Sequence, residues 1–372
     1  MEKPFDWSAI RPEFPSLRNA VYLNTATYGQ VPLRSQRATQ RHFERRDRYA
    51  CEDFLTWFDD MDELRSDVAR LIHCSADDVG FLNTACSALS LFLGGMEWRA
   101  GDRIVTLTDE FPNQYYYANQ LRERGAELLE LPEIQRIPER TRAVVISSVN
   151  YSNGYRPDLK AISRMAHEAG ALLYVDATQS MGALPFDVNE AQPDLLAVDG
   201  YKWLMCPNGA TFFYISPELR RTLPPAVIGW RSDQGWRGVD DLQHGPPRLP
   251  EGAERYEGGM LNFPSLYAMQ ESVRMISEIG PERIEKRVLS LAAMAGDVLR
   301  EFGAEVRHPG SNIVAARWPT GDASALAKEL ASQGIIVAAR HGNLRVSPHF
   351  YNDESDLQAF AGALAEIHRK VA

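Results

Sequence analysis

Between about residue 60 and residue 215, short apolar runs rich in β-branched residues alternate with stretches of helical periodicity. Such alternation is typical of βαβ crossovers, which build a buried, mostly parallel sheet with helices on both faces. We therefore expect an α/β fold. The expected strands are residues 103–107, 143–147, 172–175, 195–197 and 211–215, and the expected helices between them include residues 87–97, 114–124 and 159–169.

We expect two domains, because 372 residues exceed what one hydrophobic core usually organises, and the sequence pattern changes after residue 215. Residues 222–262 are rich in Pro, Gly and Trp, which predicts a long ordered loop of the kind that often carries function. A long helix over 264–279 and 282–301 and a tail of order β-β-α-β-β-α should follow. We place an N-terminal arm at residues 1–20, a large domain at 21–258 and a small α+β C-terminal domain at 259–372.

Charge and hydropathy limit the partners that the chain can bind. The sequence has 40 Lys and Arg against 50 Asp and Glu, a formal net charge of −10, which argues against nonspecific nucleic-acid binding. The basic run at 37–48 is interpreted as the solvated face of a helix. No stretch approaches the roughly 20 apolar residues of a membrane helix, and the first ten residues are charged and aromatic. We expect no membrane association and a cytoplasmic location.

The cysteines and histidines indicate neither a disulfide framework nor a metal site. The four cysteines show no CxxC spacing, and no expected helix carries two histidines four residues apart. No metal is therefore expected.

Two expected strands end in residues that bear on chemistry, at the sheet edge where α/β proteins bind ligands. The run 172–175 ends at Asp176, and a buried carboxylate is costly unless it meets a cation such as a protonated pyridine nitrogen. A turn-capping role for Asp176 is an equally weighted alternative. The next strand leads into Asp199-Gly200-Tyr201-Lys202, which presents a lysine between aromatic residues. An amine among apolar groups has a lowered pKa and reacts better with an aldehyde.

A surface lysine with a partly buried stem is the alternative for Lys202. Its position 26 residues after Asp176, one crossover later, favours the functional interpretation. A third strand end, in the sequence FLNTACSAL at 81–89, meets small polar residues at an expected helix start. Free N–H groups there suit a phosphate, although Ser and Thr also cap helices that bind nothing.

Several motifs, in this order along the chain, resemble a known family. They are YLNTATYG at 22–29, VDATQ at 175–179, DGYK at 199–202, EGGMLN at 257–262 and LRVSPHFYN at 344–352. The sequence is similar over nearly its whole length to the class V aminotransferase family of fold-type I pyridoxal-phosphate (PLP) enzymes. That group includes cysteine desulfurases, isopenicillin-N-epimerase-like proteins, kynureninase and carbon–sulfur lyases.

The resemblance implies PLP as the cofactor, held as a Schiff base by the catalytic Lys202. It places Asp176 against the pyridine nitrogen and Gln179 against the ring hydroxyl oxygen. The phosphate would lie at the helix start, with Asp199 nearby but too repulsive for direct contact. The residues implied around the phosphate are Thr84, Ala85, Cys86 and Tyr201.

The resemblance also implies how the substrate and a second subunit bind. Arg345 matches the arginine that grips the α-carboxylate of an amino-acid substrate, a task suited to a planar bidentate donor. Arg340 and Tyr28 are expected beside it. A homodimer is implied, in which the second subunit completes the site and Trp230 and residues 258–262 are candidates to cross.

The sequence departs from the family pattern at three places. Where several members stack a histidine on the cofactor ring, the sequence DEFPN at 109–113 offers Phe111, or Asn113 if the alignment shifts by two. Without that imidazole, Lys202 must carry more of the proton transfer. Asn150 and Ser152, in a segment that is hard to register, are expected on the cofactor side. No cysteine lies between Val337 and Arg345, where desulfurases need a mobile thiolate.

These features favour a lyase that eliminates a β-substituent, such as a thiol, from a cysteine-derived amino acid. Transamination or epimerisation of an α-amino acid follows closely, and a persulfide-forming desulfurase is disfavoured. A non-catalytic PLP-fold binding protein would not need Lys202, Asp176, Gln179 and Arg345 together. A nucleotide-binding α/β protein would need a GxGxxG or GxxxxGK[ST] turn, which the sequence lacks.

Overall fold

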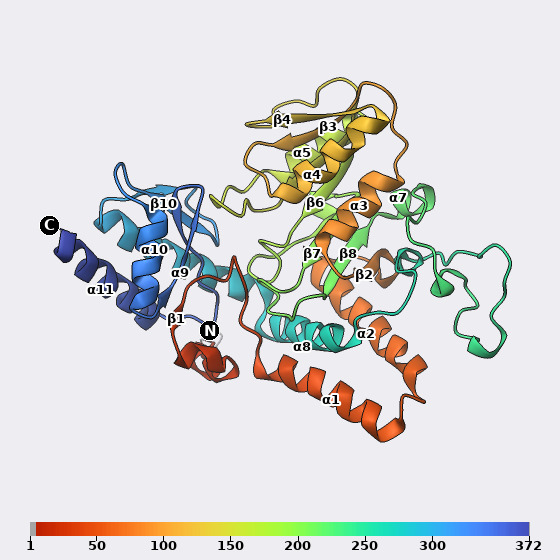
Figure 1. The fold of residues 1–372 in the computed structure, drawn as a ribbon, viewed down its shortest axis with the longest axis horizontal. Helices are drawn as coiled ribbons and strands as arrows, with labels where there is room; N and C mark the ends of the chain where they lie inside the picture. Colours follow the sequence, from red (N-terminus) through yellow and green to blue (C-terminus); the bar gives the residue numbers. More distant parts are fainter. Residues whose placement is uncertain (1–4, 372) are drawn as a thin grey trace.

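The computed structural model describes residues 5–371, and its core is a seven-stranded sheet (Figure 1). The strand order is β2-β8-β7-β6-β5-β3-β4. All neighbouring pairs from β7 to β4 are parallel, and β8 runs antiparallel to both β7 and β2. The mostly parallel sheet predicted from the sequence is confirmed. Its strands are β2 (Val79–Leu82), β3 (Asp102–Leu107), β4 (Ala126–Leu131), β5 (Thr141–Ser147), β6 (Leu172–Asp176), β7 (Leu195–Asp199) and β8 (Thr211–Ile215).

Both faces of this sheet are covered by helices, as expected. Along β5, Val144 and Ile146 pack on one side against α2, α5 and α8, whereas Ala143 and Val145 pack on the other against α3 and α4. Residues of such a central strand are apolar on both faces because neither face meets water. The helices of this domain are α1 (Leu33–Tyr49), α2 (Phe54–Ile72), α3 (Ala85–Gly95), α4 (Pro112–Gln120), α5 (Leu159–Glu168), α6 (Val188–Ala191), α7 (Pro217–Thr222) and α8 (Phe263–Ile279).

A smaller lobe follows at the C-terminal end, on the left of Figure 1. Its antiparallel sheet has the order β12-β13-β10-β9, and a two-stranded parallel sheet joins β1 to β11. The tail therefore contains one strand more than the predicted β-β-α-β-β-α order. Its elements are α9 (Pro281–Glu301), β9 (Glu305–Arg307), β10 (Val314–Arg317), α10 (Ala323–Ser332), β11 (Ile335–Ile336), β12 (Ala338–Arg340), β13 (Asn343–Val346) and α11 (Glu354–Val371), with β1 (Val21–Tyr22).

The N-terminal segment consists of short 3-10 helices between Trp7 and Arg18 that pack on the small lobe. Arg11 makes two hydrogen bonds to Asp356 of α11, and the ring of Phe14 lies 4.6 Å from that of Tyr351. The arm at residues 1–20 stays a prediction, and its first four residues lie outside the described part of the chain. The division at residue 258 stays a prediction, since α8, which follows it, packs on α1 and α2.

The loop region 222–262 contains only short 3-10 helices and is anchored by one buried carboxylate. Glu257 receives Arg65 at 2.6 Å and Arg231 at 3.0 Å, and it also accepts the Phe81 N–H of β2. The two guanidinium groups stack on aromatic rings, Arg65 on Phe81 and Arg231 on Trp236. This cluster ties the loop to the sheet beside the carboxyl end of β2.

None of the helices between residues 5 and 371 combines the length and the apolar character needed to cross a membrane.

Candidate active site

The candidate site lies where β6 and β7 end side by side. Asp176 ends β6 and pairs in register with Ala197 of β7, so Asp199 and the turn to Lys202 follow at the same edge. Both Asp176 and Lys202 are buried, 7% exposed each. The adjacent-strand geometry predicted from the sequence is thus present, and the carboxylate of Asp176 acts on the charge of Lys202.

Lys202 lies near two aromatic rings, those of Tyr201 and Phe111, whereas the sequence indicated those of its two chain neighbours, Tyr201 and Trp203. Its Nζ lies 5.5 Å from the centre of the Phe111 ring and 5.3 Å from that of Tyr201. Burial lowers the pKa of Lys202 from 10.5 to about 8, although Asp176 opposes that shift. A neutral amine is therefore available close to physiological pH, and it is the nucleophilic form of lysine.

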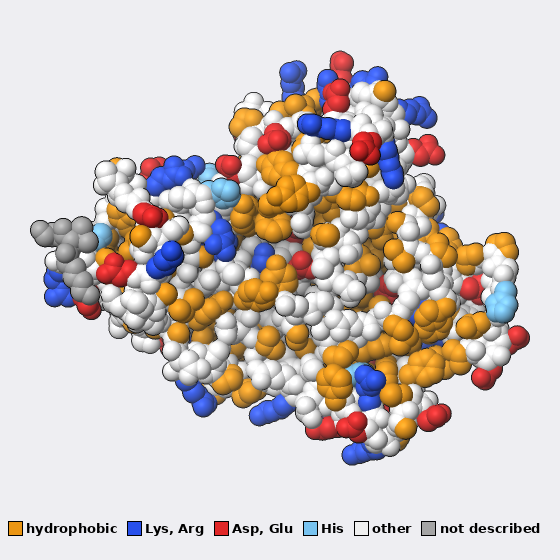
Figure 2. Space-filling view, in the orientation of Figure 1, with side chains coloured by type: hydrophobic (Ala, Val, Ile, Leu, Met, Phe, Trp, Pro, Cys, Tyr) orange, Lys and Arg blue, Asp and Glu red, His pale blue; other side chains and the backbone are white. Residues whose placement is uncertain are grey.

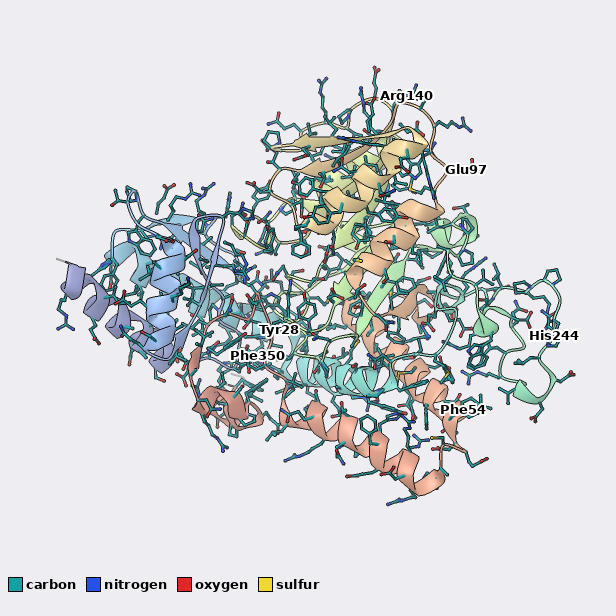
Figure 3. The ribbon with its side chains drawn as sticks, viewed as in Figure 1. Tyr28, Phe54, Glu97, Arg140, His244 and Phe350 are labelled. Carbon is teal, nitrogen blue, oxygen red and sulfur yellow. The ribbon has the colours of Figure 1, made fainter. Side chains whose placement is uncertain are left out.

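A glycine permits the close approach of the N-terminal segment to this lysine. Gly29 donates its N–H to the Tyr201 carbonyl at 2.9 Å, and a Cβ at Gly29 would lie 1.8 Å from the Lys202 carbonyl oxygen. No side chain fits there. The same segment brings Tyr28 against Tyr201, with ring centroids 5.0 Å apart, and Figure 3 shows Tyr28 where the two lobes meet.

Asp176 is hydrogen-bonded by the turn that follows it. Its Oδ1 accepts the Thr178 N–H at 2.9 Å, and a hydrogen bond from the Thr178 side chain also favours the charged carboxylate. Burial is the larger effect and raises the pKa of Asp176. A buried carboxylate at a strand end is suited to a cationic hydrogen-bond donor such as a pyridinium N–H.

Gln179 fixes the turn after β6 with both ends of its amide. Its Nε2 donates to the Ala26 carbonyl and its Oε1 accepts the Trp203 indole N–H, each at 3.0 Å. The Gln179 carbonyl in turn accepts from Asn312 of the small lobe. Only the second Nε2 hydrogen remains for a contact with a cofactor, so Gln179 also has a structural role that the sequence did not predict.

The start of α3 lies beside these strand ends. Thr84 caps the helix by accepting the Ser87 N–H, and the Ala85 N–H donates to Asp199 Oδ1 at 2.9 Å. Asp199 Oδ1 also accepts a hydrogen bond from the Thr211 hydroxyl. Of the three residues expected to cradle a phosphate, Ala85 therefore already donates its N–H to Asp199, and the hydroxyl of Thr84 is engaged in the helix cap. The carboxylate of Asp199 anchors the helix start.

Phe111 is positioned by an acidic neighbour, Glu110, which sequence reasoning overlooked. The Glu110 carboxylate accepts the Phe111 N–H, the Ser147 N–H at 2.7 Å and the Ser147 hydroxyl at 2.6 Å. Burial raises the pKa of Glu110 to about 7. The sequence signal for Glu110 is an acid in DEFPN, three residues after the end of β3, much as Asp176 is an acid at the end of β6.

Asn150 and Ser152 are hydrogen-bonded to each other. Asn150 Oδ1 accepts both the N–H and the hydroxyl of Ser152, and Asn150 Nδ2 donates to the Asp109 carbonyl. Asn150 also lines a cavity of about 350 Å³ that opens beside Glu110. Their role toward the cofactor stays a prediction, because their side chains are engaged in shaping the 150–154 turn.

The two arginines of the expected substrate site come from neighbouring strands of the small lobe. Arg345 on β13 is 1% exposed and donates to the Tyr151 carbonyl at 2.6 Å and to Thr27 Oγ1 at 2.5 Å. Arg340 on β12 also donates to Thr27 Oγ1, at 3.4 Å. Both act on the charge of Lys202, so the site is assembled from both lobes. Thr27 was not predicted, although it lies within the YLNTATYG motif.

The residues present fit PLP. A buried amine of lowered pKa can bond to an aldehyde, the buried carboxylate of Asp176 suits the ring nitrogen, and Phe111 offers a ring face near the amine. No cluster of metal-ligating side chains was found among residues 5–371.

Comparisons with known proteins identify the family. The family model of class V aminotransferases matches residues 55–360. A probable cysteine desulfurase of Methanothermobacter thermautotrophicus is 27% identical, over 96% of this chain and 97% of its own. The isopenicillin N epimerase of Streptomyces clavuligerus is 26% identical, over 96% and 98%.

The fold also resembles solved structures. The apo cysteine desulfurase of Thermococcus onnurineus superimposes with a TM-score of 0.86 at 22% identity, covering 99% of both chains. At that identity the likeness shows the fold, in agreement with the predicted architecture. The family match spans most of the sequence and agrees with the geometry around Lys202. This chain belongs to the class V aminotransferase family and is a PLP-dependent enzyme.

Proposed function

We propose that this enzyme is a lyase that removes the β-substituent, a thiol or similar group, from a cysteine-derived amino acid. The observation that carries the proposal is the set of groups around Lys202. The resemblance assigns Phe111, 5.5 Å from Lys202 Nζ, to the position where several family members have a histidine, and the segment 337–345 holds no cysteine.

One set of residues would bind the cofactor, and Arg345 would bind the substrate. Lys202 would hold the cofactor covalently, Asp176 the ring nitrogen and the start of α3 the phosphate. Bound PLP supplies a conjugated ring that accepts the electrons released when a bond at the substrate Cα is broken. Arg345, enclosed and held by Tyr151 and Thr27, would orient the α-carboxylate by paired charge-assisted hydrogen bonds.

Lys202 would then move the proton. With a pKa of about 8, its amine takes the Cα proton in the neutral form and becomes a mild acid afterwards. A leaving thiolate, whose conjugate acid has a pKa near 8.5, needs no strong acid to depart, whereas an alkoxide would. Lys202 acting alone is therefore better matched to loss of sulfur than to loss of oxygen.

Persulfide transfer is poorly supported by the cysteines of this chain. Cys206 is buried, its thiol contacts the Leu204 carbonyl, and burial raises the pKa of that thiol to about 12. Cys86 is exposed but lies at the start of α3, where the phosphate is expected. Neither is placed as the mobile thiolate of a desulfurase, despite the name of the archaeal relative.

Amino-group transfer is the second candidate. It needs only one residue to remove a proton from Cα and return it to the cofactor side, which Lys202 also satisfies. Epimerisation would require a proton donor on the face opposite Lys202.

Product analysis separates these reactions. The purified holoenzyme would be incubated with S-substituted cysteines, with Lys202→Ala as the inactive control. Elimination yields pyruvate, ammonia and one equivalent of thiol. If no pyruvate forms with any S-substituted cysteine, while an amino acid converts the cofactor to its amine form, the lyase assignment is wrong and the transferase is supported.

A homodimer is part of the proposal. Val227, Ile228 and Met260, in and beside the segment expected to cross to a second subunit, are each more than half exposed. Figure 2 shows hydrophobic side chains gathered on the side of the molecule where this loop lies next to α1 and α2. Analytical ultracentrifugation should give twice the mass of 41.8 kDa, and a monomer at micromolar concentration would contradict the proposal. The cytoplasmic location stays a prediction.

A further inference from the structure

Two guanidinium groups converge on a single hydroxyl in the substrate site. Arg340 on β12 and Arg345 on β13 both donate an Nη2 hydrogen to Thr27 Oγ1, at 3.4 and 2.5 Å. The two Nη2 atoms therefore lie within about 6 Å of each other. In the β12–β13 hairpin Arg340 pairs with Asn343, and Arg345 follows Asn343 by two residues. Residues two apart on a strand share a face, so the hairpin holds both arginine side chains on one face of the sheet.

Neither arginine meets a carboxylate. Between residues 5 and 371, no salt bridge forms to either side chain, whereas the buried Arg65 and Arg231 share Glu257. The Arg345 Nε is buried without a hydrogen-bond partner. Burial and the charge of Arg340 lower the pKa of Arg345 to about 9, and both arginines act against the charged form of Lys202. Asp176 and Asp199 offset the charge of Lys202, whereas the two arginines have no carboxylate partner among the described residues, so an anionic ligand would supply one.

One α-carboxylate balances only one of these charges. Arg345 is almost fully enclosed, with Nη1 and Nη2 fixed on Tyr151 and Thr27, which suits an invariant part of the substrate. Arg340 is only partly buried, and its hydrogen bonds are to the Ala339 carbonyl and, at 3.4 Å, to Thr27. Its remaining N–H groups are free to meet a variable part of the substrate.

We propose that Arg340 selects amino acids whose short side chain carries a second carboxylate, with Arg345 holding the α-carboxylate. The inference rests on the proposed use of an α-amino acid as substrate. For the lyase it means an S-carboxyalkyl cysteine; for amino-group transfer it means an acidic amino acid. Arg340 is thus a specificity residue in direct contact with substrate.

Binding of unreactive acids tests the charge argument without any chemistry. Glutarate and valerate have the same number of carbons, but only glutarate has two carboxylates. Calorimetric titration of the holoenzyme should show glutarate binding on the order of tenfold more tightly than valerate. Arg340→Gln should remove that preference while leaving valerate binding unchanged. Arg369→Gln, which removes an exposed arginine that hydrogen-bonds the Ala365 carbonyl of its own helix, should keep the preference.

Two results would overturn the inference. Equal affinity of the native holoenzyme for both acids would mean that no second anion is recognised. An equal loss of affinity for both acids in Arg340→Gln would mean that Arg340 only assists Arg345 with one carboxylate.

Kinetics extend the test and separate it from the proposed reaction. With S-carboxymethylcysteine and the neutral S-ethylcysteine, Arg340→Gln should raise KM about tenfold for the first alone, and any change in kcat that follows from the altered charge around Lys202 should be the same for both substrates. A lack of pyruvate from both substrates, together with a retained glutarate preference, would refute the lyase and support the diacid specificity. Faster turnover of the neutral substrate by the native enzyme would refute the specificity while leaving the lyase in place.

Discussion

The reactivity of the Lys202 amine should follow pH in a way that its surroundings determine. Burial lowers its pKa from 10.5 to about 8, so the neutral fraction at pH 7 rises about 300-fold over that of an ordinary lysine. In the apoprotein, the rate of reaction with a small uncharged aldehyde should therefore rise with pH and level off above pH 8. An uncharged aldehyde is preferable to PLP because PLP itself titrates.

Neighbouring charges should move this midpoint in opposite directions. Asp176 favours the ammonium form, so Asp176→Asn should shift the midpoint below 8. Arg345 disfavours that form, so Arg345→Gln should shift it above 8. Reductive trapping followed by peptide mapping gives the rate at Lys202, with the exposed Lys160 on α5 as an internal reference.

The reasoning would be refuted by a native midpoint near 10.5, or by variants that shift it in the same direction. The first result would mean that the amine is solvated like a surface lysine. The second would mean that loss of packing, and not charge, governs its pKa. Circular dichroism of each variant confirms that the fold is retained.

Three further predictions concern the framework of the site. Gly29→Ala should abolish the visible absorbance of bound cofactor because its Cβ would collide with the lysine backbone, while Gly362→Ala, with open space around it on α11, should keep the band; a coloured Gly29→Ala protein would count against this contact. Glu257→Gln should lower the free energy of unfolding in urea by roughly 3–5 kcal/mol, because two buried guanidinium groups lose their anion. Glu254 lies 4.0 Å from one of these groups, and Glu254→Gln should cost about 1 kcal/mol or less. Equal losses in the two variants would contradict the claim that Glu257 anchors the loop. Burial lowers the pKa of His349 from 6.5 to about 4, so between these pH values the imidazole is protonated in the unfolded chain and neutral in the folded one. The free energy of unfolding should therefore fall by about 3 kcal/mol as the pH drops from 6.5 to 4. His349→Gln should flatten this pH dependence, and an unchanged pH dependence would mean that another group causes it.

The central strands and the lysine were predictable because their signals are local. β5, β6 and β7 are uniformly apolar where both sheet faces are covered, and Asp176 and Lys202 stand directly after two of them. β4 was missed because Glu127 and Glu130 interrupt its apolar pattern, as is common at a sheet edge that meets water.

The supporting contacts could not be predicted because they join distant parts of the chain. Asp199 reaches the start of α3, 114 residues earlier, and Arg345 reaches Thr27, 318 residues earlier. Nothing in the local sequence of Asp199 indicates a helix anchor in place of a ligand contact. Likewise, the charge of Arg340 is visible in the sequence, but its lack of a carboxylate partner is a property of the folded chain.

The central claim is that Lys202 carries the cofactor. The chain has six lysines, which makes the attachment site easy to assign. The holoenzyme would be reduced with borohydride, digested and mapped by mass spectrometry. The account predicts a single pyridoxyl-phosphate mass increment, on the peptide that contains Lys202. An increment on any other lysine, or an equal increment in Lys202→Ala, would contradict it.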